Sequence, residues 1–455
     1  MNVQRTNNTI EKVRQLQRKL YLAAKSNKKR RFHALYDKIY RIDILREAWK
    51  KVKVNKGAQG IDGVTIKSIK EYGEEKILEE ISETLKSNTY RPLPVRRTYI
   101  PKNDGKGSKR PLGIPIVKDR IVQMATKIVI EPVFEADFLD CSYGFRPKRN
   151  AHMALDKIYI EGANGKALWV IDADIKNYFG NINHDKLMIL VKQRICDRRI
   201  LKLIDKWLKA GVMENGQFTK SEKGAPQGGV ISPLLSNIYL HYFDYIWDKY
   251  YKTVGTLVRY ADDFVILCRN YASAKKALSI TKAIMNKLEL TLHEEKTKLV
   301  DMYNGKDGFD FLGFHNRFKR GRTKKWKFYW DLFQFPSKKA MNKMTENIRE
   351  VFKSPAKRLL ALKDMIKILN PKIIGMRNYY GIPYAMDKLR IIDNYIIKKF
   401  TIWYNLKRQR PYRLEKMKEF RLLVYKEGLK TLSGSRMLKD EEYRKAVCWK
   451  TARTV

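Results

Sequence analysis

Apolar positions recur at helical spacing in several parts of the chain. In the first of them the apolar positions are Val13, Leu16, Leu20 and Ala24. Basic residues lie between them, which predicts amphipathic helices over residues 9–49, and the basic run at residues 28–31 divides this segment in two. The same spacing predicts helices over residues 119–137 and 271–289, and the chain beyond residue 337 is almost wholly helical and basic in character.

Short runs of β-branched and aromatic residues predict strands elsewhere. The predicted strands cover residues 96–102, 166–175, 256–260 and 264–268. Gly and Asn at residues 103–108 predict a turn after the first strand, and Ala261-Asp262-Asp263 predicts the turn of a hairpin between the last two. Because helices and strands are mixed without strict alternation, the pattern predicts an α+β fold.

The chain carries a large excess of positive charge. Its 455 residues include 95 Lys and Arg against 48 Asp and Glu, so the formal net charge is +47, and the pI is about 10.0. Self-repulsion at this charge opposes a compact state unless an anionic partner is bound, and such a pI is typical of nucleic-acid binders. Hydrophobic residues make up 44%, which is enough for a large core and excludes a wholly disordered chain.

The cysteines and histidines do not form a disulfide or metal-binding pattern. Four Cys and six His are scattered, without CxxC or HExxH, which argues against a disulfide framework and a zinc nuclease domain and favours a reducing compartment. No run of about 18 apolar residues predicts a transmembrane helix, and the N-terminus lacks the apolar core of a signal peptide. An organelle transit peptide is disfavoured because the basic N-terminus is poor in Ser.

Three aspartates are candidates for catalysis. Asp262 and Asp263 are adjacent at the hairpin turn, and Asp174 lies at the end of the predicted strand 166–175. A strand end and a hairpin turn can be neighbours in one antiparallel sheet, which would bring the carboxylates together. Carboxylates held this close need a cation between them or a proton on one of them, and Mg²⁺ prefers carboxylate and phosphate oxygens. Taken alone, Asp-Asp at a turn is more often ordinary turn chemistry.

Sequence blocks around these aspartates favour a catalytic role over ordinary turn chemistry. They are Arg110–Arg120, Ser142–Pro147, Asp174–His184, Gly224–Pro233, Tyr260–Asp263, Glu294–Thr297 and Phe311–Phe314. In this order they resemble the blocks of reverse transcriptases, with Tyr-Ala-Asp-Asp as the YxDD box. The subgroup that they most resemble is the bacterial group II intron-encoded reverse transcriptases, or maturases. The likeness is strong over residues 46–330 and weaker over residues 337–400.

The resemblance implies a right-hand polymerase of the α+β class, with fingers and a palm built on an antiparallel sheet, followed by a helical thumb. The implied division has a basic helical N-terminal extension at residues 1–45 and the fingers and palm at residues 46–330. The helical thumb, or maturase domain, would follow at residues 331–400. The basic C-terminal region at residues 401–455 is a candidate DNA-binding segment.

Within this resemblance the aspartates take defined roles. Asp174 and Asp262 match the metal-binding pair, to which Ile175 would add its backbone carbonyl. Asp263 would support the site electrostatically, and Asp172 is a secondary candidate on the same predicted strand. The implied cofactor is Mg²⁺, as two ions about 4 Å apart that stabilise the attacking and leaving oxygens of a phosphoryl transfer, with Mn²⁺ as a substitute.

The resemblance also implies contacts with the incoming nucleotide. Phe179 matches a steric gate that excludes a 2′-hydroxyl and so selects dNTPs, although core packing is the simpler reading of an isolated aromatic residue. Lys102 and Arg110 match the basic pair that binds the triphosphate. Gln227 matches a residue that packs against the nucleotide and the template base. Lys296 matches a lysine suggested as general acid for the pyrophosphate, with an ordinary surface lysine as the alternative.

The block Phe311, Leu312 and Gly313 resembles the primer grip, a hairpin that holds the primer 3′ end. Basic residues interleaved with aromatic ones follow it, namely Arg317, Lys319, Arg320, Arg322, Lys324 and Lys325. Cations can track phosphates while aromatic rings stack on bases. A solvated basic face over buried aromatic rings is the alternative.

The implied function is that of an RNA-directed DNA polymerase that also assists the splicing and mobility of its intron. Its partners would be a structured intron RNA, a DNA primer or target and dNTPs, without a membrane, in the bacterial cytoplasm at the nucleoid; the pattern indicates no particular oligomeric state. Two alternatives stay open. One is a non-catalytic splicing factor, which the intact aspartates disfavour, and the other is a reverse transcriptase recruited to host defence or repair.

Overall fold

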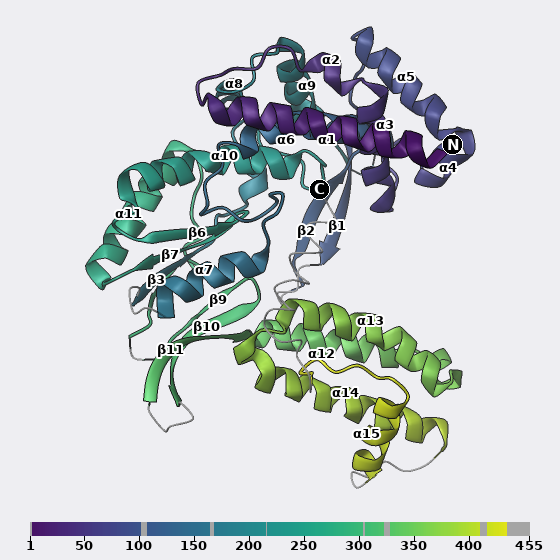
Figure 1. Cartoon of the computed structure of the whole chain (residues 1–455), viewed down its shortest axis with the longest axis vertical. Helices are drawn as coiled ribbons and strands as arrows, with labels where there is room; N and C mark the ends of the chain where they lie inside the picture. Colours follow the sequence, from purple (N-terminus) through teal and green to yellow (C-terminus); the bar gives the residue numbers. More distant parts are fainter. Residues whose placement is uncertain are drawn as a thin grey trace. The chain divides into compact units, whose positions relative to one another are not determined.

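The chain folds into two compact units of mixed α and β structure (Figure 1). In this computed structural model, residues 2–101, 107–163, 168–214, 216–303, 305–322, 328–409 and 416–434 are described, with the backbone alone at residues 2–8, 163, 320–322, 328–330 and 416–419. The first unit comprises Met1–Leu155, Ala173–Ile266 and Tyr271–Lys298, and the second comprises Asp156–Asp172, Leu267–Asn270 and Leu299–Val455. Each is described by itself below.

The N-terminal helices of the first unit pack on one another. Helix α1 (Asn2–Ser26) lies against α6 (Val117–Glu135), and α3 (Ile42–Val54) contacts both (Figure 1). Of the apolar positions of α1 that set its predicted spacing, Val13, Leu20 and Ala24 are buried and Leu16 is half-buried. The predicted break after α1 is confirmed, because the short α2 (Tyr36–Ile39) lies between the two long helices.

The other helices of this unit complete its core. They are α4 (Ile66–Tyr72), α5 (Glu74–Lys86), α8 (His184–Lys192), α9 (Arg198–Lys209), α10 (Ser232–Ile246) and α11 (Tyr271–Lys287), with the single turn η1 (Tyr178–Gly180) and the π-helix η2 (Trp247–Tyr251). Helix α7 (Ala151–Ala163) spans the division between the units. The predicted helices 119–137 and 271–289 are therefore confirmed within two residues at each end as α6 and α11.

The first sheet has the strand order β2-β1-β4-β5. Its strands are β1 (Val95–Pro101), β2 (Lys109–Ile114), β4 (Val212–Glu214) and β5 (Gln217–Thr219). Strands β1 and β2 are antiparallel, with Ile100 opposite Arg110, and β1 and β4 are parallel. The Gly113 N–H donates to the Gln227 carbonyl at 2.6 Å, so this sheet is fastened to the loop that carries Gln227.

The second sheet has the strand order β6-β7-β3-β8 and holds the predicted hairpin. Its strands are β6 (Thr256–Tyr260), β7 (Asp263–Cys268), β3 (Trp169–Ala173) and β8 (Lys298–Asp301). The hairpin is confirmed, but β3 ends at Ala173 and is shorter than the predicted strand 166–175. It stops there because Ile175 makes only an isolated antiparallel bridge with Leu292.

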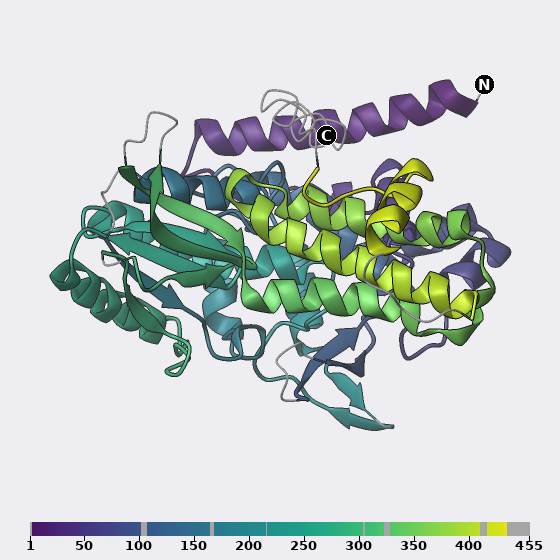
Figure 2. The same cartoon turned by 90° about the horizontal axis from the view of Figure 1, so that it is seen from below.

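The second unit contains a three-stranded sheet and a helical bundle (Figures 1 and 2). The sheet has the order β11-β10-β9, formed by β9 (Phe309–Phe311), β10 (Phe314–Arg322) and β11 (Phe328–Pro336). The helices are α12 (Lys338–Lys353), α13 (Leu362–Tyr380), α14 (Met386–Lys407) and α15 (Lys416–Lys426), with the single turns η3 (Pro355–Leu359) and η4 (Pro383–Ala385). The helical character predicted beyond residue 337 is thus confirmed for the described residues.

One continuous apolar core joins the helices of this bundle. It extends from Ala340 in α12 through Phe400 in α14 to Leu432 after α15. Helix α14 therefore continues through the predicted division after residue 400, and α3 and β11 likewise continue through the divisions after residues 45 and 330. The assignment of the four regions as domains stays a prediction. No helix in the described parts of the chain has the length and apolar character that a membrane span needs.

A buried ion pair in the first unit holds the turn between β6 and β7. Arg259 in β6 and Asp244 in α10 are both fully buried. Arg259 Nε donates to Asp244 Oδ1 at 2.7 Å, and Nη2 donates to the second oxygen. The other N–H groups donate to Asn237 Oδ1 (3.2 Å), Ser142 Oγ (2.7 Å) and the Ala261 carbonyl (2.8 Å). All five guanidinium N–H groups are thus paired.

We expect Asp244→Ala to lower the free energy of unfolding by about 3–5 kcal/mol, because it leaves the Arg259 charge buried and unpaired. Replacing both partners with apolar residues, Arg259→Met with Asp244→Leu, should recover most of the loss. Denaturant unfolding measures both effects. The control is Asp205→Ala, which breaks an exposed pair with Lys209 and should cost less than about 1 kcal/mol. Equal losses for the two single variants would contradict this role of the pair.

Candidate active site

The turn between β6 and β7 is held in a single conformation by its neighbours. Ala261 has a left-handed backbone with φ of 58°, and its carbonyl accepts the hydrogen bond from Arg259. Gly144 packs directly against this turn, where a Cβ would clash with the Ala261 backbone nitrogen. The Gly144 carbonyl in turn accepts a hydrogen bond from Asn237 Nδ2 at 2.8 Å. The positions of Asp262 and Asp263 are therefore set by the buried core beneath them.

The backbone around Asp174 is held by the segment after α11. The Asp174 carbonyl accepts a hydrogen bond from the His293 N–H at 2.8 Å, and the Lys176 N–H donates to the Thr291 carbonyl at 2.9 Å. Ile175 lies between them, opposite Leu292. These two hydrogen bonds use the groups on either side of Ile175, so this bridge does not occupy the Ile175 carbonyl.

Electrostatic interactions join the predicted catalytic residues. Burial raises the pKa of Asp262, and the charge of Asp174 raises it further. Desolvation by the surrounding protein and, to a smaller extent, the negative charges of Asp262 and Asp174 raise the pKa of Asp263 to about 6. Arg110 opposes the rise at both carboxyl groups, and Lys296 opposes it at Asp263. The structure therefore brings these five predicted residues to one place.

Lys296 forms an ion pair with the first aspartate, Asp174. Its Nζ lies 2.5 Å from Asp174 Oδ2, and the lysine side chain is more than half exposed. It reaches this position from the segment that follows His293, whose N–H is bonded to the Asp174 carbonyl. A partly exposed lysine at this carboxylate is available to an anionic ligand at the site.

The carboxylates fit a divalent cation that completes its coordination with substrate. Among the described residues, no three His, Cys, Asp or Glu side chains are arranged as a ready-made metal site. Mg²⁺ is usually bound by one or two carboxylates together with substrate phosphates and water. Asp174 and Asp262 supply two carboxylates whose mutual repulsion raises the pKa of Asp262, and a cation between them would relieve that repulsion.

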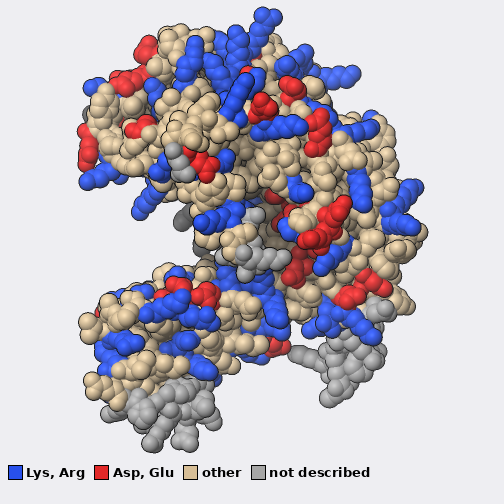
Figure 3. Space-filling view, turned by 180° about the vertical axis from the view of Figure 1, so that it is seen from behind, with Lys and Arg blue, Asp and Glu red and all other residues tan. Residues whose placement is uncertain are grey.

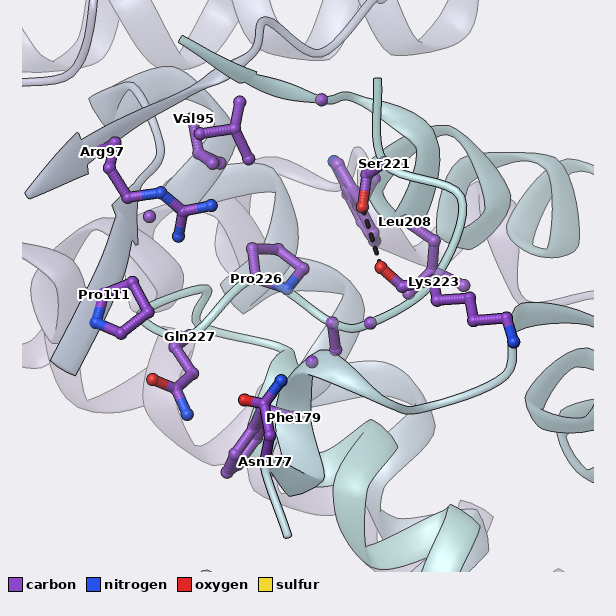
Figure 4. A pocket seen from close by; sticks show the side chains of 17 residues that line it. Val95, Arg97, Pro111, Asn177, Phe179, Leu208, Ser221, Lys223, Pro226 and Gln227 are labelled. Atoms are coloured by element: carbon purple, nitrogen blue, oxygen red, sulfur yellow. Dashed lines mark hydrogen bonds between the residues drawn. The ribbon is translucent and has the colours of Figure 1, made fainter. Parts of the chain in front are cut away.

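A cavity of about 190 Å³ lies between the first sheet and the loop that carries Gln227 (Figure 4). Phe179 and Asn177 line one side of it, and Arg97 reaches it from β1. Pro226 and Gln227 lie between these two sides in Figure 4. Phe179 therefore lines a cavity, whereas its neighbour Tyr178 is buried in the core.

The turn that presents Phe179 is fixed by backbone hydrogen bonds. Asn177 has a left-handed conformation with φ of 44°, and the buried Tyr178 hydroxyl donates to the Ser236 carbonyl at 2.7 Å. The Phe179 carbonyl accepts a hydrogen bond from the Ala225 N–H at 2.8 Å. This contact does not depend on the side chain at position 225, since it is made by the backbone.

The remaining nucleotide-site predictions have mixed outcomes. Arg110 lies on β2 and acts on Asp262 and Asp263 through its charge, whereas Lys102 lies outside the described residues. Gln227 lines the cavity, and its Oε1 is buried without a hydrogen-bond partner among the described residues. A buried acceptor without a partner is costly, so Gln227 is suited to receive a ligand donor.

The block that resembles the primer grip forms the predicted hairpin in the second unit. Leu312 and Gly313 are its two turn residues, with φ of 51° and 80°, and Phe311 ends β9. Arg317 Nε donates to the Gly305 carbonyl at 2.8 Å, and Lys319 Nζ lies 4.8 Å from the centre of the Phe335 ring. Outside the described side chains or residues lie Arg320, Arg322, Lys324 and Lys325.

Comparisons with known proteins agree with this arrangement. Residues 100–316 match the family described as reverse transcriptase (RNA-dependent DNA polymerase), and residues 341–420 match the group II intron maturase-specific domain. The group II intron-encoded protein LtrA of Lactococcus lactis subsp. cremoris is 32% identical over 441 residues, which cover 79% of this chain and 72% of LtrA. Protein YkfC of Escherichia coli (strain K12) is 36% identical over 347 residues, which cover 68% of this chain and 90% of YkfC.

The chain belongs to the group II intron-encoded reverse transcriptase and maturase family. It is accordingly an RNA-directed DNA polymerase. A third relative, the uncharacterized 91 kDa protein in the cob intron of Schizosaccharomyces pombe, is 28% identical over 433 residues, which cover 78% of this chain and 51% of the relative. The family resemblance predicted from the sequence blocks is confirmed.

Sequence reasoning missed the residues that support the site of this reverse transcriptase. Arg259 and Asp244 were not singled out, although a lone Arg in an apolar strand and a lone Asp in an apolar helix are a recognisable signal. Burial of unlike charges in two such elements indicates a pair. Gly144 lies within a recognised block, but only the structure shows that it contacts the Ala261 backbone.

We expect Gly224→Ala to reduce DNA synthesis by this reverse transcriptase by about tenfold or more, because small displacements of positioning groups are costly in rate. Gly224 has φ of 90°, and a Cβ there would lie 2.9 Å from the Phe179 carbonyl oxygen and 3.0 Å from that of Gly180. Both oxygens belong to the turn that presents Phe179. Steady-state dNTP incorporation measures the effect.

The matched control is Gly216→Ala. Gly216 has a similar φ of 82°, but a Cβ there meets no atom of the described residues within 4 Å. It should carry only the backbone strain of a left-handed Ala, about 1–2 kcal/mol, with dNTP incorporation unchanged. If both variants incorporate dNTPs equally well, the contact between Gly224 and the Phe179 turn does not matter for activity.

Proposed function

We propose that this reverse transcriptase copies structured intron RNA into DNA by two-metal phosphoryl transfer at Asp174, Asp262 and Asp263. The observation that carries the proposal is the convergence of these carboxylates beside Arg110 and Lys296, where the charge of Asp174 raises the pKa of both Asp262 and Asp263. Acidic groups gathered in a chain of net charge +47 are suited to cations that accompany an anionic substrate. The same protein would assist the splicing and mobility of its intron, in keeping with the maturase-domain match.

The proposed cofactor is a pair of Mg²⁺ ions, with Mn²⁺ as a substitute. Asp174 and Asp262 would hold them through their carboxylates, and Ile175 through the carbonyl that its bridge with Leu292 leaves unused. When bound, the ions supply charge stabilisation to the attacking and leaving oxygens. Asp263, which is exposed and adjacent to Asp262, would add negative charge that favours the cations.

The basic residues beside the aspartates would handle the triphosphate. Arg110 and Lys102 would bind its phosphates, where positive charge stabilises the charge that develops on transfer. Lys296, which lies beside Asp174, would donate a proton from its ammonium group to the leaving pyrophosphate. Its exposed position at Asp174 supports this role.

The cavity beside Phe179 would select the sugar and the base. The Phe179 ring would exclude a 2′-hydroxyl, and the rigid support of its turn by Ala225 favours such a steric role. Gln227 would place its unpartnered Oε1 toward the nucleotide or the template base. Selection by shape requires that the ring cannot move aside, and the hydrogen bond that holds the Phe179 backbone supports this role.

The proposed architecture is a right hand with fingers and a palm at residues 46–330 and a thumb at residues 331–400, flanked by basic segments at residues 1–45 and 401–455. On the face drawn in Figure 3, Lys and Arg side chains are spread over much of the described surface. Such a surface suits an RNA template and a DNA primer or target, whose binding should weaken steeply with salt. The bacterial origin of LtrA and YkfC supports a place in the bacterial cytoplasm at the nucleoid.

The test of this function is primer extension on a DNA-primed RNA template, with Mg²⁺ and dNTPs. We expect Asp262→Asn to abolish extension while RNA binding and assistance to intron splicing stay near normal, because the change removes one charge without removing volume. Asp205→Asn, at an exposed aspartate paired with Lys209, is the control and should extend primers normally. Loss of RNA binding together with extension in Asp262→Asn would mean that the aspartate is structural.

We expect Phe179→Val to raise incorporation of ribonucleotides relative to deoxyribonucleotides by at least about tenfold, because a smaller side chain leaves room for the 2′-hydroxyl. Phe218→Val, at an exposed Phe in β5, is the control with the same change of side chain. Single-nucleotide incorporation with matched dNTP and rNTP pairs measures the ratio. An unchanged ratio would refute the gate assignment.

A further inference from the structure

The turn between β9 and β10 is strained and is held from outside. Leu312 has φ of 51°, a left-handed conformation that costs a residue with a side chain about 1–2 kcal/mol. Its carbonyl accepts a hydrogen bond from the Tyr379 hydroxyl at 2.9 Å. The next carbonyl, that of Gly313, accepts a hydrogen bond from the Ser337 N–H at 2.9 Å. Both carbonyls of the turn are thus bonded to residues far along the chain.

The end of α13 places two tyrosines against this turn. The centre of the Phe314 ring lies 5.6 Å from that of Tyr379 and 5.2 Å from that of Tyr380. A Cβ on Gly313 would lie 3.1 Å from the Tyr380 hydroxyl, so the turn approaches the tyrosine closely. The helix stops directly after Tyr380, at Gly381, where a Cβ would lie 2.5 Å from the Arg377 carbonyl.

A second attachment joins the same sheet to the connection that follows α13. Tyr384 in η4 stacks on Phe333 of β11, with ring centres 4.2 Å apart. Its hydroxyl donates to Asp331, which also accepts a hydrogen bond from Tyr159 at 3.1 Å. The C-terminal end of α13 is therefore fixed to the sheet on both sides of Gly381, and the turn and the helix end form one rigid element.

We propose that Tyr379 is a positioning residue that fixes the Leu312–Gly313 turn to α13, so that the helical bundle sets the position of the primer 3′ end. The proposal rests on the assignment of this turn as the primer grip. Tyr379 would act through the Leu312 carbonyl rather than on the substrate. Nucleic acid bound along α13, which exposes Lys363, Lys367 and Lys372, would then act on the primer end through the same hydrogen bond.

The test is Tyr379→Phe in the full chain, assayed by primer extension. The change removes a single oxygen and keeps the ring that packs on Phe314. We expect the KM for primer–template to rise about threefold to tenfold, the size expected for the loss of one hydrogen bond, with a matching fall in processivity. The KM for dNTP, the kcat at saturating primer–template and the melting temperature should stay close to those of the parent protein, which separates positioning from a general structural role.

Tyr380→Phe is the matched control. Its ring packs on Phe314 in a similar way, and among the described residues its hydroxyl makes no hydrogen bond to Leu312 or Gly313. It should leave the KM for primer–template unchanged. Equal KM values for Tyr379→Phe, Tyr380→Phe and the parent protein would overturn the proposal.

A third variant, Gly313→Ala, distinguishes failure of the Tyr379 proposal from failure of the primer-grip assignment. Gly313 has φ of 80°, so an added Cβ disturbs the turn itself whatever Tyr379 does. If Gly313→Ala weakens primer use and Tyr379→Phe does not, the turn is the primer grip but Tyr379 does not position it. If Gly313→Ala also leaves primer use unchanged, the primer-grip assignment fails, and the proposal fails with it.

Discussion

The buried pair of Arg259 and Asp244 is the constraint on which the candidate active site depends. Taking two charges out of water costs several kcal/mol per ion unless hydrogen bonds compensate, so the guanidinium must keep every partner that it has. Those partners are Ser142, Asn237 and Asp244 as well as the Ala261 carbonyl. One planar group therefore ties together three separate parts of the chain. An apolar pair could stabilise the core equally well, but it would not fix the carbonyl that precedes the aspartates.

Asp262 and Asp263 are held in an arrangement that disfavours their charged forms. The pKa of Asp263 is raised to about 6 despite a net charge of +47 on the chain, because distant exposed cations are screened within about 10 Å. Only nearby charges therefore affect this pKa. Arg110 and Lys296 lower it, but by less than desolvation and the neighbouring aspartates raise it. This unfavourable arrangement persists because the buried contacts beneath the turn, such as that of Arg259 with the Ala261 carbonyl, hold the turn in place. In the proposed function this crowding would favour a cation between Asp174 and Asp262, because the cation would relieve the repulsion between the carboxylates.

The sequence pattern predicts those features of the structure that depend on residues close together in the chain. The hairpin at Asp262 and Asp263 and helix α6 each follow from spacing or turn chemistry within a few residues. The ordered blocks identify the family, and the hairpin at Leu312–Gly313 is expected from that resemblance. The supports of these features are not local. Arg259 meets Ser142, and Tyr379 meets Leu312, through contacts between segments far apart in sequence. The spacing of apolar residues cannot predict such long-range contacts. The end of β3 at Ala173 likewise depends on a distant residue, because Ile175 pairs with Leu292.

Three turns that carry candidate functional residues share one construction. Each contains a residue other than glycine in the left-handed region, namely Asn177, Ala261 and Leu312. In each, a carbonyl is held by a group from outside the turn: Phe179 by the Ala225 N–H, Ala261 by the Arg259 side chain and Leu312 by the Tyr379 hydroxyl. Strained backbone persists only where its surroundings over-determine it. The strain therefore marks where the fold gives up stability for position, at the turn before Phe179, at Asp262 and Asp263, and at Leu312–Gly313.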